Sequence, residues 1–268
     1  RAKTGRPHEI EQNIEHSKRL NPEYEYHLFD DEDIKAFILE HYGEVIWDYY
    51  QRIAPIYGAA RADFFRYLLV YQLGGVYIDI KSSLDKPLKD VLRAEDQFIL
   101  THWDNRPGEQ YEGIGIYPEL GTLPRGEYIQ WCIASVAGHP FLRAVILQML
   151  RNIDEYTPFR HGAGLWGVLR TTGPVMYTKV IEAMRPTLVE GKDYRMLDKP
   201  QEIGLRYSIF DTAGVYGHKK ALKANYNKAY TPIIVTPDRP LYAKCAKYYL
   251  FARLAIRVLG DKIAARFK

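Results

Sequence analysis

The 268-residue sequence contains only two cysteines, Cys132 and Cys245, and no Asn-x-Ser/Thr sequence that could accept an N-linked glycan. The cysteines lie far apart and form neither a CxxC motif nor a spacing typical of metal ligands. This excludes a disulfide framework and favours a reducing compartment. The missing glycosylation sequence argues against passage through a secretory lumen. Together these absences predict a cytoplasmic location rather than a Golgi lumen.

The sequence also lacks internal repeats, low-complexity tracts and long apolar runs. No run reaches the roughly 18 apolar residues that a membrane-spanning helix needs, so we expect no such helix. The net charge of +4 favours anionic ligands or an anionic membrane surface, but it is too small to indicate a nucleic-acid partner. Tyrosine is the one excess, with 22 copies. Its flat ring and hydroxyl suit sugars and nucleobases, although we expect most of these side chains at the edge of the core.

Helical and strand-like segments alternate along the chain. Helical spacing predicts helices at residues 9–20, 32–41, 45–56 and 140–153, and another from Pro174 onward. Alternating or short apolar runs predict strands at residues 24–29, 76–80, 97–102, 128–136 and 233–235. This order is typical of an α/β domain with a largely parallel sheet. The glycine-rich segments 103–125 and 156–172 are expected to be long, irregular walls of a site.

We expect a main domain at residues 1–240 and a basic helical tail at residues 241–268. The tail places apolar residues along one helical stripe, flanked by arginine and lysine. Such a helix can lie on an anionic membrane or dock on the main domain, and both alternatives stay open. Combined with a cytoplasmic location, the first alternative predicts peripheral contact with the inner face of the cell membrane.

The most informative segment is residues 59–88, AARADFFRYLLVYQLGGVYIDIKSSLDKPL. It predicts a mostly apolar helix, a stop at two glycines, and a strand with Asp79 at its end. The helix should be buried, yet it carries Asp63 and Arg66 three residues apart and therefore on one face. Buried charges are costly unless they are paired or used, and ligands of open α/β sheets bind beyond the carboxyl ends of strands. The segment therefore predicts an active site.

Lys81 stands where a metal site would prefer a second carboxylate. An Asp-x-Asp pair would bind Mg²⁺ or Mn²⁺, which can clamp a diphosphate leaving group. Lys81 could instead neutralise part of the phosphate charge itself. It could also point away and leave Asp79 to hold the metal with other groups, of which Asp85 is the nearest carboxylate. The sequence leaves open both metal dependence and metal independence through Lys81.

Residues 60–80, ARADFFRYLLVYQLGGVYIDI, resemble the DXD-motif glycosyltransferases. This family includes fungal Golgi initiating mannosyltransferases, bacterial capsule and lipopolysaccharide sugar transferases and, more distantly, the clostridial glucosylating toxins. Weaker matches are NPEYEYHLFDDEDI at residues 21–34, ASVAGHP at 134–140, TTGP at 171–174 and a late histidine, His218. The family opens with a strand that precedes Lys-Thr. Because this sequence starts at RAKTG, we expect that first strand to be missing.

The resemblance implies a GT-A-like, Rossmann-like α/β fold with a mainly parallel sheet flanked by helices. It implies a retaining glycosyltransferase that moves a sugar from a nucleotide-sugar donor to a glycan or glycolipid acceptor, as in surface polysaccharide biosynthesis. It also implies that Asp63 and Arg66 bind the donor sugar and that Tyr77 and Asp79 lie at the metal motif.

By the same resemblance, the catalytic residues are Asp63, Arg66 and Asp79. Lys81 departs from the motif but belongs to the predicted donor site. His218 sits where the family places a histidine near the diphosphate, so Asp79 and His218 are the predicted ligands of Mn²⁺ or Mg²⁺.

Two other functions stay open. A degenerate, non-catalytic member that binds a nucleotide sugar or a glycan is compatible with Lys81 in the metal motif. A glycoside hydrolase would use paired carboxylates. It is less favoured, because the pattern of Asp63 and Asp79 matches a donor site and no partner that activates water is evident. For each residue a structural role also stays open: an ion pair for Asp63 and Arg66, a strand-end cap for Asp79, and a solvated lysine for Lys81.

Overall fold

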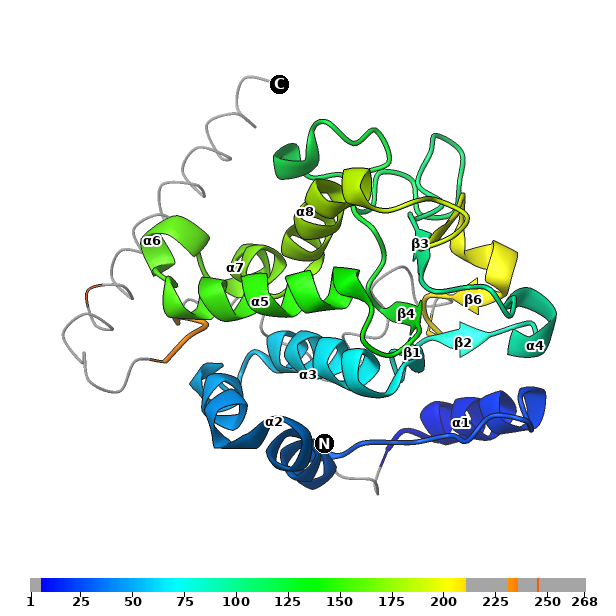
Figure 1. Cartoon of the computed structure of the whole chain (residues 1–268), viewed down its shortest axis with the longest axis horizontal. Helices are drawn as coiled ribbons and strands as arrows, with labels where there is room; N and C mark the ends of the chain where they lie inside the picture. Colours follow the sequence, from blue (N-terminus) through cyan, green and yellow to red (C-terminus); the bar gives the residue numbers. More distant parts are fainter. Residues whose placement is uncertain (1–5, 211–230, 236–244, 246–268) are drawn as a thin grey trace, which may run out of the picture.

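The computed structural model describes residues 6–210, 231–235 and Cys245. Most helices gather on one side and the short strands on the other (Figure 1). The helices are α1 His8–Leu20, α2 Asp31–Arg52, α3 Gly58–Leu73, α4 Leu88–Val91, α5 Pro140–Asp154, α6 Pro158–His161, α7 Gly164–Thr171 and α8 Pro174–Met184. The 3₁₀ turns are η1 Pro118–Leu120, η2 Arg185–Thr187 and η3 Pro200–Ile203. The strands are β1 Gly75–Ile78, β2 Ser83–Leu84, β3 Ile99–Thr101, β4 Cys132–Ser135, β5 Arg195–Leu197 and β6 Leu205–Arg206.

The strands pair mostly in antiparallel fashion. β1 pairs with β4 and β2 with β6, both antiparallel, whereas β3 and β5 run parallel. A single bridge between Phe98 and Ser135 links the β3 and β4 regions. The mixed α/β character is confirmed, but a mainly parallel sheet is not seen in the part of the chain that the structure describes. Apolar patterning marks a strand without fixing its direction, which depends on long-range pairing.

Helix α3 is buried because neighbouring elements cover it on several sides. It lies between α2 and α5 in Figure 1, and it also contacts α7, β1 and β4. Phe64, Tyr67 and Leu68 on this helix belong to the main apolar core. An apolar surface all round is the pattern expected of such an enclosed helix. The charged side chains of Asp63 and Arg66 on α3 are therefore held inside the protein.

A glycine turn connects α3 to β1. Gly74 has φ 68°, and a Cβ at this position would lie 2.7 Å from the backbone nitrogen of Ala137. A side chain is excluded there by both backbone conformation and space. Strand β1 then ends at Ile78, two residues earlier than predicted, so Asp79 opens the following loop.

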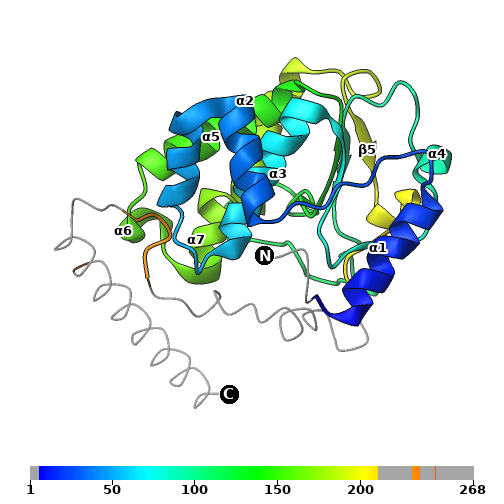
Figure 2. The same ribbon diagram turned by 90° about the horizontal axis from the view of Figure 1, so that it is seen from below.

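Helices α1 and α2 agree with the sequence, with one difference. Asp30 caps α2 and forms a capping box with Asp33, as the two adjacent aspartates suggest. The two predicted helical segments at 32–41 and 45–56 are the two parts of α2, separated by Gly43, whose φ of 74° is not helical, but the second part ends at Arg52. Helix α1 lies on the strand side of the molecule (Figures 1 and 2), where Asn13 donates a hydrogen bond to the backbone oxygen of Ser82.

Three local predictions are wrong. Residues 24–29 alternate in polarity but form no strand, and the side chains of Tyr24 and Tyr26 are exposed, so no sheet surface covers them. Residues 233–235 contribute only one bridge, from Ile234 to Ile53. Residues 156–172 contain α6 and α7 rather than a long irregular loop, because Thr157 caps α6 and α7 buries its Val168 face.

The predicted tail at residues 241–268 lies outside the described residues, apart from Cys245. Within the described part of the chain, no helix combines the length and the apolar character needed to cross a membrane.

Candidate functional site

Asp63 lies in the middle of α3 with its carboxylate enclosed by protein. Its Oδ1 accepts a hydrogen bond from Gln130 Nε2 at 3.1 Å, and its Oδ2 accepts one from Thr172 Oγ1 at 2.9 Å. Burial raises the pKa of Asp63 to about 6, against the opposing effects of Arg66 and of Thr172. Asp63 is therefore a carboxyl that titrates near neutral pH inside the fold.

Arg66, one helical turn further on, joins the two predicted carboxylates. Its Nη2 lies 3.4 Å from Asp63 Oδ1 and 3.1 Å from Asp79 Oδ1. Its Nη1 donates to the backbone oxygen of Gln130 at 2.7 Å, and its guanidinium lies 4.9 Å from the centre of the Tyr77 ring. Burial alone would lower the pKa of Arg66, but the charges of Asp79, Tyr77 and Asp63 together outweigh burial and raise it. The guanidinium is a fixed positive charge at the centre of the site.

Asp79 follows β1, whose last residues place it beside Arg66. Its Oδ1 also accepts a hydrogen bond from the Tyr77 hydroxyl at 2.9 Å. Burial would raise the pKa of Asp79, but Arg66 and then Lys81 lower it to about 2. The Asp79 carboxylate is therefore ionised throughout the physiological range.

Lys81 points toward Asp79 rather than toward solvent. Its Nζ donates to Asp79 Oδ2 at 2.5 Å and lies 4.4 Å from the centre of the Tyr207 ring. Lys81 is only 7% exposed, which excludes the solvated lysine. Burial lowers the pKa of its ammonium group, whereas Asp79 opposes that change. We call Asp63, Arg66, Asp79 and Lys81 the charged cluster.

The described residues do not fit a divalent metal at Asp79. One oxygen of Asp79 is bound by Arg66 and Tyr77 and the other by Lys81, so both face cationic or hydroxyl donors. Among residues 6–210, 231–235 and 245, no group of three or more His, Cys, Asp or Glu side chains could hold a metal ion. Asp85, the next candidate carboxylate, lines a cavity elsewhere. The second predicted ligand, His218, lies outside the described residues.

Sequence reasoning missed three residues that complete the charged cluster. Gln130 and Thr172 hold the Asp63 carboxylate, and Tyr207 covers Lys81. Only Thr172 had a signal, since it belongs to the TTGP match. Tyr67 reinforces this arrangement, because its hydroxyl donates to the Gln130 side chain and to the backbone oxygen of Thr172.

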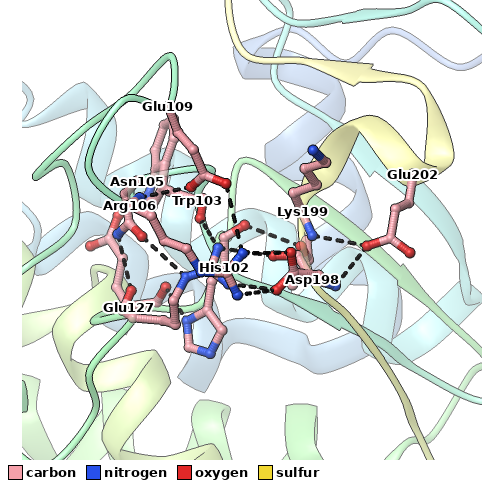
Figure 3. Close-up of polar contacts among 11 residues, drawn as sticks. His102, Trp103, Asn105, Arg106, Glu109, Glu127, Asp198, Lys199 and Glu202 are labelled. Atoms are coloured by element: carbon pink, nitrogen blue, oxygen red, sulfur yellow. Dashed lines mark hydrogen bonds and ion pairs between the residues drawn. The ribbon is translucent and has the colours of Figure 1, made fainter.

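The predicted loop at 103–125 is irregular except for η1, and it is fastened to the end of β5. Arg106 forms two hydrogen bonds with the carboxylate of Asp198, at 2.8 and 2.6 Å (Figure 3). Arg125 adds a third at 2.7 Å. Beside it, Trp103 Nε1 donates to Glu127 Oε1 at 2.7 Å. Burial raises the pKa of Glu127 to about 8, although this hydrogen bond opposes the change. The loop is thus held both by ion pairs and by apolar packing, since Trp103, Tyr111 and Leu120 lie in buried apolar clusters.

Two cavities lie away from the charged cluster. One, of about 420 Å³, is bordered by α4, β5 and η3, and its lining includes Asp90, Arg195 and Glu202. The other, of about 130 Å³, lies near Asp96 and Tyr194. No member of the charged cluster lines either cavity. Chemistry, not cavity size, therefore identifies the candidate site.

Comparison with known proteins identifies the region that contains the cluster. Residues 7–99 match the family described as "Glycosyltransferase sugar-binding region containing DXD motif". The chain is 30% identical to the initiation-specific alpha-1,6-mannosyltransferase of Candida albicans, in an alignment covering 60% of this chain and 44% of that protein. It is 28% identical to inositol phosphoceramide mannosyltransferase 3 of Schizosaccharomyces pombe, over 62% of this chain and 38% of that protein.

The chain thus spans less than half the length of both curated relatives. A solved structure titled "PaToxG Glycosyltransferase" aligns with 91% of this chain and 80% of its own, at a TM-score of 0.42 and 15% identity. That score is too low to support an argument about the fold. Residues 7–99 thus match the predicted family, and the curated relatives named above are glycosyltransferases, the predicted enzyme class.

The comparison also corrects the predicted location. The relatives are fungal mannosyltransferases, the branch of the family that the resemblance assigned to the Golgi. The predicted cytoplasmic location, with contact at the inner face of the cell membrane, is therefore wrong. It depended on two cysteines and a missing glycosylation sequence, and a lumenal protein without disulfides or N-linked glycans satisfies both conditions.

Proposed function

Since residues 7–99 belong to the sugar-binding region of the DXD-motif glycosyltransferases, we propose that this chain transfers a sugar from a nucleotide-sugar donor to a hydroxyl of a glycan or glycolipid, with retention at the anomeric carbon. One observation carries the proposal. The α3 residues Asp63 and Arg66 meet Asp79 in a single buried cluster, which supports the donor site that the resemblance implies. A finer GT-A-like classification of the fold belongs to the same proposal.

The transfer reaction places negative charge on the departing diphosphate. The bond between the sugar carbon and the diphosphate oxygen breaks, and its electron pair stays on the diphosphate. The acceptor hydroxyl oxygen bonds to the same carbon, and its proton passes to the departing diphosphate. Arg66 stabilises the negative charge that develops on the leaving group, because a preorganised cation in a buried site acts strongly.

Asp63 is suited to hold a sugar hydroxyl. A carboxylate offers about four acceptor positions, and the hydrogen bonds from Gln130 and Thr172 use two of them. Arg66 approaches a third from 3.4 Å. The remaining position can accept a hydrogen bond from the donor sugar, with the carboxylate already oriented by its protein partners.

The relatives narrow the choice of substrates. Those named above are mannosyltransferases, and one name specifies inositol phosphoceramide. We therefore propose a hexosyl donor, with mannose first, and a glycan or glycolipid acceptor such as those of surface polysaccharides. Tail-mediated contact with an anionic membrane stays a prediction for residues 241–268.

The test is release of nucleoside diphosphate from a panel of UDP- and GDP-linked sugars. We expect turnover by the 268-residue chain with at least one donor. Asp63→Asn should reduce that turnover by about 10²-fold, since it removes one preorganised contact. Asp48→Asn, an exposed change on α2, is the matched control and should leave turnover unchanged. Full activity of a folded Asp63→Asn variant would remove Asp63 from the site.

A non-catalytic binding protein is the second candidate. The observation that favours it is the saturation of Asp79, whose two oxygens already have protein partners. Retained binding of UDP or GDP without turnover of any sugar in the panel would support this candidate over transfer. Cleavage of a glycan without nucleotide would instead support the hydrolase.

A further inference from the structure

Lys81 places a cation at the position where the metal motif has its second carboxylate. The ammonium group of Lys81 binds the very carboxylate that would otherwise be the first metal ligand. The Tyr207 ring packs against it at 4.4 Å, which is a favourable cation–π distance. Two protein contacts from different parts of the chain thus fix the ammonium at this place.

A divalent cation at Asp79 would have to displace that ammonium. Mg²⁺ and Mn²⁺ need several oxygen ligands in their first shell, whereas the second position of the motif supplies a nitrogen cation. Arg66, on the other oxygen of Asp79, adds a second positive charge. Both neighbours would repel a metal ion bound to this carboxylate.

The charges of the cluster balance without a metal. The two cations, Arg66 and Lys81, offset the two carboxylates, Asp63 and Asp79. A carboxylate at position 81 would make the cluster more negative by two charges, which is the charge that one divalent ion supplies. Lys81 therefore achieves the electrostatic balance that an Asp-x-Asp pair reaches only with its metal.

The ammonium also keeps hydrogen-bonding capacity for a ligand. A lysine has three N–H donors. Asp79 takes one of them and the Tyr207 ring covers another side, so a donor is left for a phosphate oxygen. Asp79 holds the ammonium in position and opposes the lowering of its pKa by burial. This makes Asp79 a positioning residue for Lys81.

We propose that Lys81 takes the place of the divalent metal, so that this chain binds the diphosphate of its donor, and stabilises its departure, without a metal ion. The inference rests on the proposed function. When the bond between the sugar carbon and the diphosphate oxygen breaks, Lys81 and Arg66 neutralise the negative charge gained by the diphosphate. The acceptor proton moves to that diphosphate as described above, so no further reactant is needed.

The experiment measures binding of UDP and GDP by calorimetry to the 268-residue chain, in EDTA and in Mn²⁺. The wild type should bind at least one nucleotide equally well in both. Lys81→Met should weaken binding by about 10²-fold, and Lys81→Arg should recover part of it because it keeps the charge. Lys89→Met, an exposed change on α4, is the matched control and should bind as the wild type does.

Lys81→Asp gives a second, independent readout. It rebuilds the carboxylate pair, so it should bind Mn²⁺, detected by electron paramagnetic resonance, and should bind nucleotide only when Mn²⁺ is present. The double variant Asp79→Asn/Lys81→Met removes both charges of the buried pair. It therefore leaves no unpaired buried charge of this pair, which in a single variant could unfold the protein. It should fold and still lose nucleotide binding.

The outcomes separate this inference from the proposed function. Nucleotide binding or sugar turnover that requires Mn²⁺ in the wild type would overturn the inference and leave the function standing. Nucleotide binding by Lys81→Met that is as strong as in the wild type would also overturn the inference and leave the function standing. Metal-independent binding that depends on Lys81, without turnover of any donor, would support Lys81 as the metal substitute in diphosphate binding and overturn the transferase. A wild type that binds neither nucleotide in either buffer would overturn both.

Discussion

The middle of α3 and the end of β1 each bring a carboxylate to the same arginine, but they surround it in opposite ways. Asp63 is held mainly by the neutral donors Gln130 and Thr172, and burial raises its pKa to about 6. Asp79 lies between Arg66 and Lys81, which lower its pKa to about 2 in spite of burial. With a single cation beside it, the buried Asp63 carboxyl thus stays able to titrate, whereas two cations keep Asp79 ionised.

This contrast fits a division of labour. A carboxylate with neutral partners can accept hydrogen bonds from an uncharged sugar. A carboxylate fixed between cations serves instead to position those cations, which can then face a diphosphate. Substitution of the shared partner, Arg66, or of either carboxylate should therefore change the stability of the protein in a different way.

The largest effect is expected from Arg66→Met, because the change leaves Asp63 without its cation and Asp79 with Lys81 alone. Removing one partner of a buried ion pair costs about 3–5 kcal/mol of unfolding free energy. Urea denaturation at neutral pH measures this loss of unfolding free energy. The control is Arg160→Met, which breaks a surface pair with Glu155 and should cost at most about 1 kcal/mol. Equal losses in the two variants would show that Arg66 does not hold the cluster together.

The next effect concerns the pH dependence caused by Asp63. Its folded pKa of about 6 lies above its usual value, so between about pH 4 and 6 the folded chain holds a proton that the unfolded chain has released. Unfolding free energy should therefore fall as pH rises through this window, by on the order of 3 kcal/mol. Asp63→Asn should lack that fall. Parallel profiles of unfolding free energy against pH for wild type and variant would contradict a buried Asp63 carboxyl with a raised pKa.

The smallest effect, of opposite sign, belongs to Asp79. Its folded pKa of about 2 lies below its usual value, so between about pH 4 and 2 the unfolded chain takes up the proton first. The wild type should lose on the order of 2 kcal/mol as pH falls through this window. Asp79→Asn should not show this loss. Identical acid profiles of wild type and variant would mean that Arg66 and Lys81 do not stabilise the ionised form.

The sequence was informative where local pattern and chemistry coincide. An apolar helix makes Asp63 and Arg66 conspicuous, and the two glycines mark its end, so α3, β1 and the position of Asp79 could be predicted. The direction of Lys81 could not, because it depends on Tyr207, which reaches it through a long-range contact. Gln130, from near β4, carries no local signal for its role, and Thr172, at the end of α7, is marked only by the TTGP match.

The fold errors have a related physical origin. Alternating polarity at residues 24–29 suggested a strand, but a strand also needs a partner, and the side chains of residues 24–27 face solvent. Glycine and aromatic content at 156–172 hid α7, in which Gly167 packs closely against the backbone of Gly162. A glycine chosen for close packing has the same appearance in a sequence as a glycine chosen for a loop.

The most direct test of the central claim, that the charged cluster is the donor site, is a crystal structure of the chain with GDP or UDP bound in the presence of EDTA. We predict diphosphate oxygens within hydrogen-bonding distance of Lys81 Nζ, beside Asp79 and Arg66. A diphosphate bound instead in the cavity lined by Arg93 and Arg195, with the cluster unchanged, would contradict the account.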